Sequence, residues 1–432
     1  MNKLFLTSII VLLAGCASVG DIMRTTKPTN TVYNSSSPSL SGYKYDEASQ
    51  MIEMCIELND QDDRLNGASP DSYSYVDPKK WKLVYDSRNQ VADDVVHYKQ
   101  NKSTLYPWHK LYDEIIRNAD KKYPNGWNRD TINSDPSLNG FGPWQNAWLL
   151  YEGVGKYKGS YTIAIRGTVM SNEPSAVEDV LTNPVSAIGF LSNRVNFADQ
   201  DNPDASVHSG FSHATFTLLL DDRYGILRVL NDDKINNVNL YITGHSQGAA
   251  MTTLTHSFFH YAMRDNLFGL KDQYKLKSYG FAQPKPGNMT YATDVNRITQ
   301  KYDNAIVINN DIDLVPMMPL TLQSGEDMTS QIPGQTLSDR FVKNVTEISL
   351  TIRKNLSKMF EDEIKDDAEG YGYFYNYPLL EPIGKDKPVS SLNYSSAGHV
   401  ITVSGTPGDP PDTFGQHHSP NYRKLVNEQL NW

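Results

Sequence analysis

The segment from Leu240 to Ala250 constrains the fold more than any other part of the chain. It is an apolar strand that runs into Gly-His-Ser-Gln-Gly and then into helix-forming residues. A strand that turns directly into a helix leaves no room for side chains beside the central residue, so Gly244 and Gly248 allow the turn to close. Ser246 then lies at the tip, and the amino end of the helix stabilises negative charge beside it. The segment predicts a nucleophilic serine; the alternative is a glycine-rich turn with a helix-capping serine.

Strands and helices alternate on both sides of this turn. Apolar runs predict strands at 147–151, 160–165, 277–281 and 305–308. A helix is expected to open at Val207 and to continue to residues 231–233, because its apolar residues recur at helical spacing. This rhythm is typical of a mostly parallel sheet with helices on both faces. Ligand-binding side chains in such a fold lie at the carboxyl ends of the strands.

Residues at three of these strand ends have candidate roles in acyl transfer. The reaction needs two amide donors for the developing oxyanion, and one belongs to the residue after the nucleophile, Gln247. Thr168 follows the strand at 160–165 and is placed to supply the second donor; a simple strand exit is the alternative. Asp311 and Asp313 follow the strand at 305–308 and are carboxylates at the same sheet edge.

Five motifs in this order resemble the class 3 lipases, the fungal-lipase-like branch of the α/β-hydrolases. They are Ala164–Thr168, Val207–Phe211, Thr243–Gly248, Tyr279–Asn288 and Asp313–Pro316. The resemblance implies an α/β-hydrolase fold in which Ser246 attacks an ester carbonyl and the amides of Thr168 and Gln247 bind the oxyanion. It also implies that Asp313, rather than Asp311, orients the histidine, and that no cofactor is needed. The chain departs from the family at Ala249, where glycine is common, and in a long insertion after Pro319.

The histidine of the triad must follow the acid in this fold, which leaves His399, His417 and His418. His399 lies in a strand-like run and is expected to be structural. The other two precede a helix whose N-cap is expected at Ser419. The family places a tyrosine one turn after its histidine, and counting back from Tyr422 favours His417. Counting back from the cap favours His418, which we slightly prefer while keeping both.

Three further histidines are expected to pack rather than to react. His245 stands beside the serine, and His256 and His260 lie four apart on the following helix. That spacing suits a metal ion, but the pair lacks the intervening glutamate of a metalloprotease motif. The sequence therefore predicts no metal site.

The amino terminus has the features of a targeting segment. Residues 4–13 form an apolar stretch that is too short to span a bilayer, after a basic start at Lys3. Leu-Ala-Gly-Cys, ending at Cys16, resembles the lipobox of bacterial lipoprotein signals. The resemblance implies that Cys16 becomes the lipidated first residue and, because Ala17 is not aspartate, that the protein is sorted to the outer membrane. An ordinary secretory signal is the alternative.

The chain is expected to divide into four parts. They are a signal peptide (1–15), a lipidated cysteine with a flexible tether (16–44), an N-terminal extension packing on the body (45–135), and the hydrolase domain with an insertion (136–432, insertion 320–396). Helices are expected at 45–58 and 108–119 of the extension. Residues 170–207 are a candidate lid. An amphipathic helix over 345–364 either packs on the protein or lies on lipid.

Charge and cysteine content limit the function further. A net charge of -10 argues against nucleic acid as a partner, and two cysteines, one of them used for lipid, cannot build a disulfide framework. We expect a lipid-anchored serine hydrolase of the cell envelope that acts on lipid esters at an interface. The alternatives are a phospholipase A1 or lysophospholipase, an acyltransferase, and a non-catalytic surface lipoprotein.

Overall fold

A seven-stranded sheet, in the order β1-β2-β3-β6-β7-β9-β11, forms the centre of the protein. The computed structural model describes residues 42–65, 74–101, 109–142, 144–169, 184–188, 196–300, 303–319, 394–407 and 415–431. The strands are β1 (Trp81–Asp86), β2 (Trp148–Gly153), β3 (Ser160–Ile165), β6 (Val238–His245), β7 (Tyr274–Phe281), β9 (Ala305–Asn310) and β11 (His399–Val403). Five of them, from β3 to β11, pair in parallel, and β1 and β2 add antiparallel pairs at one edge. The predicted α/β fold with a mostly parallel sheet is confirmed.

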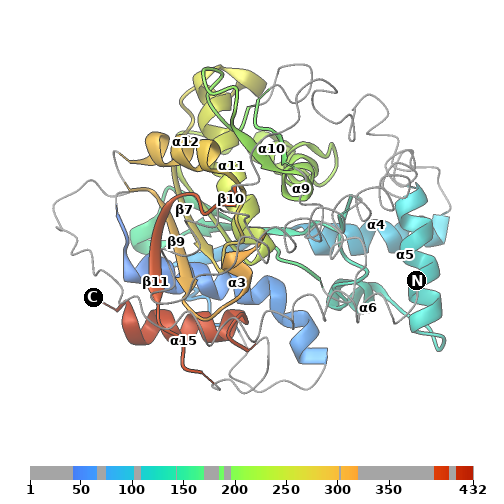
Figure 1. Ribbon diagram of the computed structural model, residues 1–432. Coiled ribbons are helices and arrows are strands. Elements are labelled where there is room, and N and C mark those ends of the chain that lie inside the picture. The colour runs from blue at the N-terminus through green and yellow to red at the C-terminus, as the bar shows by residue number, and fades with distance from the viewer. Residues whose placement is uncertain are drawn as a thin grey trace, which may run out of the picture.

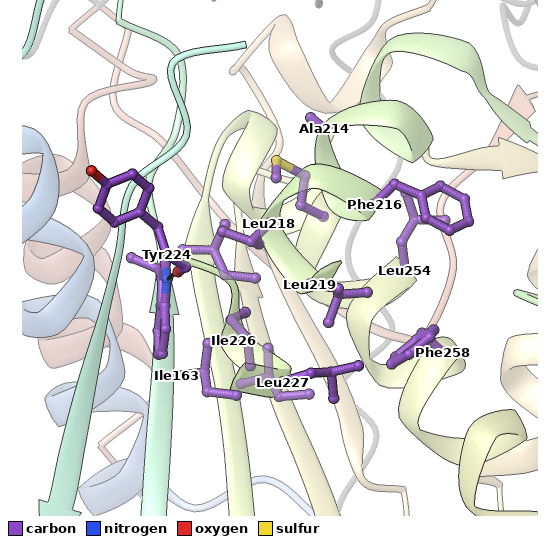
Figure 2. Packing of buried hydrophobic residues seen from close by; sticks show 14 of the residues in the cluster. Ile163, Ala214, Phe216, Leu218, Leu219, Tyr224, Ile226, Leu227, Leu254 and Phe258 are labelled. Atoms are coloured by element: carbon purple, nitrogen blue, oxygen red, sulfur yellow. Dashed lines mark hydrogen bonds between the residues drawn. The ribbon is translucent and has the colours of Figure 1, made fainter. Parts of the chain in front are cut away.

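One face of the sheet is covered by helices from several parts of the chain. These are α4 (Ser87–Asn101), α9 (Ser209–Leu220), α10 (Ile226–Asp232), α11 (Gln247–Arg264) and α12 (Met289–Thr299). Figure 2 shows Ile163 of β3 facing apolar side chains of α9, α10 and α11, including Leu219, Leu227 and Leu254. Side chains alternate between the two faces of a strand, so Ile163 and Ile165 enter this core while Ala164 enters the other.

The opposite face is covered by the first and the last helix of the described residues. Helices α3 (Tyr45–Leu65) and α15 (Ser419–Gln429) lie side by side against the sheet (Figure 1). The Tyr43 hydroxyl donates to the Leu430 carbonyl at 2.9 Å, and Arg423 pairs with Glu53 at 3.2 Å. The first described helix therefore supports the last one.

The N-terminal extension also contributes a strand to the sheet. Strand β1 was not expected from the sequence, because only Trp81 of its six residues is fully buried and the others show no apolar alternation. The helices α5 (His109–Lys122) and α6 (Arg129–Ser134) follow α4, and α6 begins in a capping box formed by Asn128 and Thr131.

The single helix expected from Val207 to residues 231–233 is wrong. Helix α9 ends at Leu220, and the Asp221 side chain accepts hydrogen bonds from the amides of Arg223 and Tyr224 before α10 begins. These bonds form a local turn that competes with the helix, which is a property of aspartate that apolar spacing does not reveal.

A second, four-stranded sheet includes part of the segment that was expected to be a lid. Its order is β10 (Tyr394–Ser395), β8 (Gly287–Asn288), β5 (Ser206–His208) and β4 (Pro184–Ser186). Short 3-10 helices occur at Gly155–Tyr157, Leu267–Gly269 and Val315–Met317. The signal segment, most of the tether, the greater part of 170–195 and the helix expected at 345–364 lie outside the described residues. Within the described ranges, no helix is both long and apolar enough to cross a membrane.

Candidate active site

Ser246 lies at a sharp turn between β6 and α11, as the glycine pattern predicts. Its backbone is strained, with φ 59° and ψ −132°, and its amide donates to the Phe281 carbonyl of β7 at 2.9 Å. A Cβ on Gly244 would lie 2.2 Å from the Gly248 carbonyl oxygen, and one on Gly248 would lie 2.5 Å from the Ile165 oxygen. The turn therefore closes only with glycine at both positions, and the start of α11 packs directly on the exit of β3.

His417 connects Ser246 to Asp313 through its two ring nitrogens. Its Nε2 lies 2.8 Å from the Ser246 Oγ, and its Nδ1 lies 2.9 Å from the Asp313 Oδ2. The three side chains come from the β6–α11 turn, the loop after β9 and the residue preceding the α15 cap. In this arrangement an imidazole can take the serine proton while the carboxylate holds the ring.

Asp313 is only 1% exposed and is surrounded by hydrogen-bond donors. The amide of Val315 donates to Oδ1 at 3.0 Å, and the Tyr422 hydroxyl donates to Oδ2 at 2.7 Å. Burial acts to raise the pKa of Asp313, but His417 and these hydrogen bonds outweigh it and lower the pKa. The carboxylate is therefore charged over the whole neutral range. Tyr422 was expected only as a landmark, and its spacing of one turn from the histidine was the signal of this contact.

The structure brings His417, not His418, to the serine, which corrects the slight preference for His418. The N-cap of α15 is His418 itself, and Ser419 is the first helical residue. Counting back from a cap placed one residue too late shifted the choice by one position, whereas counting from Tyr422 gave His417.

Two further candidates, Asp311 and His399, have partners outside the triad, and His399 lies at the amino ends of the parallel strands, away from Ser246. Asp311 accepts a hydrogen bond from the Gly405 amide at 2.9 Å. His399 is the first residue of β11, where it is paired opposite Ile306 of β9.

The two residues expected to bind the oxyanion lie on adjoining segments. Gln247 is the first residue of α11 and is buried, and Thr168 is half-buried three residues beyond β3. The loop that holds Thr168 is fixed by Arg166, whose guanidinium donates to the Asn139 Oδ1 and to the Gln145 carbonyl, each at 2.5 Å. Neither contact was foreseen, because residues 139–145 carry no recognisable motif.

Comparison with known proteins gives a family match. Residues 162–323 match the family model described as lipase (class 3). No match was found among curated protein sequences. This segment contains Thr168, Ser246 and Asp313, and His417 lies beyond it.

Several solved lipase structures are similar to this chain. The M37 lipase is 15% identical over 80% of this chain and 91% of its own, with a TM-score of 0.38. The Rhizomucor miehei lipase propeptide complex is 16% identical over 56% and 66%, with a TM-score of 0.30. The lipase from Rhizopus microsporus var. chinensis is 16% identical over 55% and 71%, with a TM-score of 0.30. Residues 162–323, which include the serine at the strand-to-helix turn, are therefore the part of the chain that matches the class 3 lipases, a family of carboxylic ester hydrolases.

Proposed function

We propose that this protein hydrolyses carboxylic esters of lipids, of the triacylglycerol type, with Ser246, His417 and Asp313 as its triad. The observation that carries the proposal is the position of His417, whose two nitrogens lie within 2.9 Å of the serine and the carboxylate. A helix-capping serine needs no such partner, so the geometry favours a nucleophile.

The reaction follows from the positions of these groups. His417 Nε2 takes the Ser246 proton as Oγ attacks the ester carbonyl, and the resulting oxyanion accepts hydrogen bonds from the amides of Gln247 and Thr168. The C–O bond to the alcohol then breaks, and His417 gives the proton to the leaving alcohol. Water, deprotonated by the same nitrogen, attacks the acyl-enzyme. The acyl C–Oγ bond then breaks, His417 returns the proton to Oγ, and the fatty acid and the free serine are released. Asp313 keeps the Nδ1 proton of His417 in place throughout.

Labelling with a fluorophosphonate probe tests the nucleophile directly. We expect Ser246→Ala to abolish labelling, and His417→Ala and Asp313→Ala to slow it by about 1,000-fold or more. His418→Ala is the matched control, since it removes the neighbouring imidazole, and it should label at close to the wild-type rate. Equal labelling of wild type and Ser246→Ala, or none of the wild type, would overturn the proposal in favour of a non-catalytic lipoprotein.

The class of lipid is tested by comparing substrates. We expect hydrolysis of short-chain esters and of a triglyceride emulsion. Faster release from phosphatidylcholine or its lyso form would replace the triacylglycerol proposal with a phospholipase A1 or lysophospholipase. Transfer of the acyl group to an added alcohol or sterol in preference to water would replace it with an acyltransferase.

We propose further that Cys16 is lipidated and anchors the enzyme in the outer membrane. The support is the Leu-Ala-Gly-Cys sequence and the polar segment that separates it from α3. The wild type should incorporate a clickable fatty acid and sediment with outer membranes, while Cys16→Ser should do neither. A wild type that remains unlabelled in the bacterial host would show an ordinary secretory signal instead.

A further inference from the structure

The main-chain carbonyl of His417 has its hydrogen-bond partner outside α15. Helix α15 has its N-cap at His418, and the His418 carbonyl is the first to accept helical bonds, from the amides of Asn421 and Tyr422. The His417 carbonyl lies one residue too early to join this pattern. Its partner is His245, whose Nε2 lies 2.7 Å from the His417 oxygen.

His245 reaches this carbonyl because of the alternation along β6. Tyr241 contacts Glu47 of α3, and Thr243 contacts Cys55 of the same helix, so both side chains point to the face covered by α3 and α15. His245 is next in this series. Its ring centroid lies 4.8 Å from that of His417 and 5.5 Å from that of Tyr422.

The protonation of His245 follows from its surroundings. The side chain is 4% exposed. Burial, followed by the charges of His417 and His418, lowers the pKa of His245 well below 6.5. Asp313 and the His417 carbonyl act in the opposite direction but do not outweigh burial. The ring is therefore neutral and carries one N–H. Because a carbonyl oxygen only accepts hydrogen bonds, the proton lies on Nε2.

We infer that His245 is a positioning residue, which holds the main chain of His417 so that the imidazole of His417 meets Ser246. Two consecutive residues then contact His417. Ser246 lies 2.8 Å from its ring nitrogen, and His245 lies 2.7 Å from its main-chain carbonyl oxygen. The inference rests on the proposed function. On this inference, the histidine of the Gly-His-Ser-Gln-Gly turn contributes to catalysis as well as to packing.

The test compares two substitutions of His245 with one of another buried histidine. His245→Phe keeps an aromatic ring and removes the donor, while His245→Gln keeps an N–H donor of similar reach. His256→Phe is the matched control, because His256 is 3% exposed and its Nδ1 lies 2.9 Å from the Ser278 Oγ, away from the triad. The measurements are the rate and final extent of fluorophosphonate labelling, and kcat and KM on a soluble ester.

We expect His245→Phe to label about tenfold or more slowly yet to completion, because a base displaced by a fraction of an ångström still reacts. Its kcat should fall while KM stays unchanged, His245→Gln should recover most of the rate, and His256→Phe should match the wild type. The rate is taken from the fraction that labels, so a partly unfolded sample does not change it. A similar loss of rate in both His→Phe variants would overturn the inference. Wild-type kinetics in His245→Phe would also overturn the inference, but they would not contradict the proposed triad. A wild type that does not label removes the proposed function and this inference together.

Discussion

Removing the Tyr422 hydroxyl should weaken both the fold and the catalytic site. The hydroxyl donates to the Asp313 Oδ2 at 2.7 Å and accepts from the Asn310 amide at 3.0 Å. Burial and the charge of Asp313 raise the pKa of Tyr422 far above its usual value, so the hydroxyl stays protonated and donates at every pH of interest. Tyr422→Phe leaves the carboxylate with His417 and Val315 as donors.

The size of the effect follows from these two contacts. A hydrogen bond to a charged group contributes about 1.5–3 kcal/mol, and leaving the buried Asn310 N–H unpaired costs about 1–3 kcal/mol. Because neighbouring groups partly relax around the missing hydroxyl, we expect the free energy of unfolding to fall by about 2–4 kcal/mol. If about 1.4 kcal/mol of this loss also appears in the transition state, kcat falls about tenfold.

The pH dependence distinguishes the Asp313 contact from general loosening. The folded pKa of Asp313 is lowered, so its ionisation stabilises the fold above 3.8 and this stabilisation is lost as the pH falls through the folded pKa. Tyr422→Phe reduces that lowering. The difference in stability between variant and wild type should therefore be full at neutral pH and shrink below 3.8.

Urea unfolding and ester hydrolysis measure the two effects. Tyr261→Phe is the matched control, because Tyr261 is also buried and donates to a buried carboxylate, Asp294, remote from the triad. The control should lose stability and keep its kcat. The reasoning is refuted if Tyr422→Phe loses as much stability as the control and retains wild-type kcat.

Three further predictions concern the turn, the acid and a buried base. Asp313→Asn keeps the shape of the side chain but should lose about 10⁴-fold in kcat, measured on a soluble ester, because the amide favours the wrong tautomer of the histidine. Gly244→Ala places a Cβ 2.2 Å from the Gly248 oxygen, so urea unfolding should show a loss of about 2 kcal/mol or more, together with slower labelling. Burial lowers the pKa of His256 from 6.5 to about 3, so this one group should reduce the stability of the wild type by about 1.4 kcal/mol per pH unit as the pH falls through that window. His256→Phe removes this component, and an unchanged slope in acid unfolding would contradict it.

The sequence determined those features that depend on neighbours along the chain. The turn at Ser246 follows from two glycines that flank one residue, and alternating apolar runs predicted β3, β6, β7 and β9 at nearly the observed places. These features are local, because a tight turn and a strand buried on both faces each restrict the residue types at a few neighbouring positions.

The tertiary structure decided the choices that depend on contacts between distant segments. His417 contacts Ser246 although the two residues lie 171 positions apart along the chain. The position of α15 on the sheet determines that His417, and not His418, makes this contact. The same packing makes α3 a support for α15 and turns His245 toward the His417 carbonyl. A shift of one residue at a helix start changes which side chain faces the site by about 100°. The packing of α15 against α3 and β11 fixes that rotation. The sequence therefore leaves two histidines possible, and the fold selects one of them.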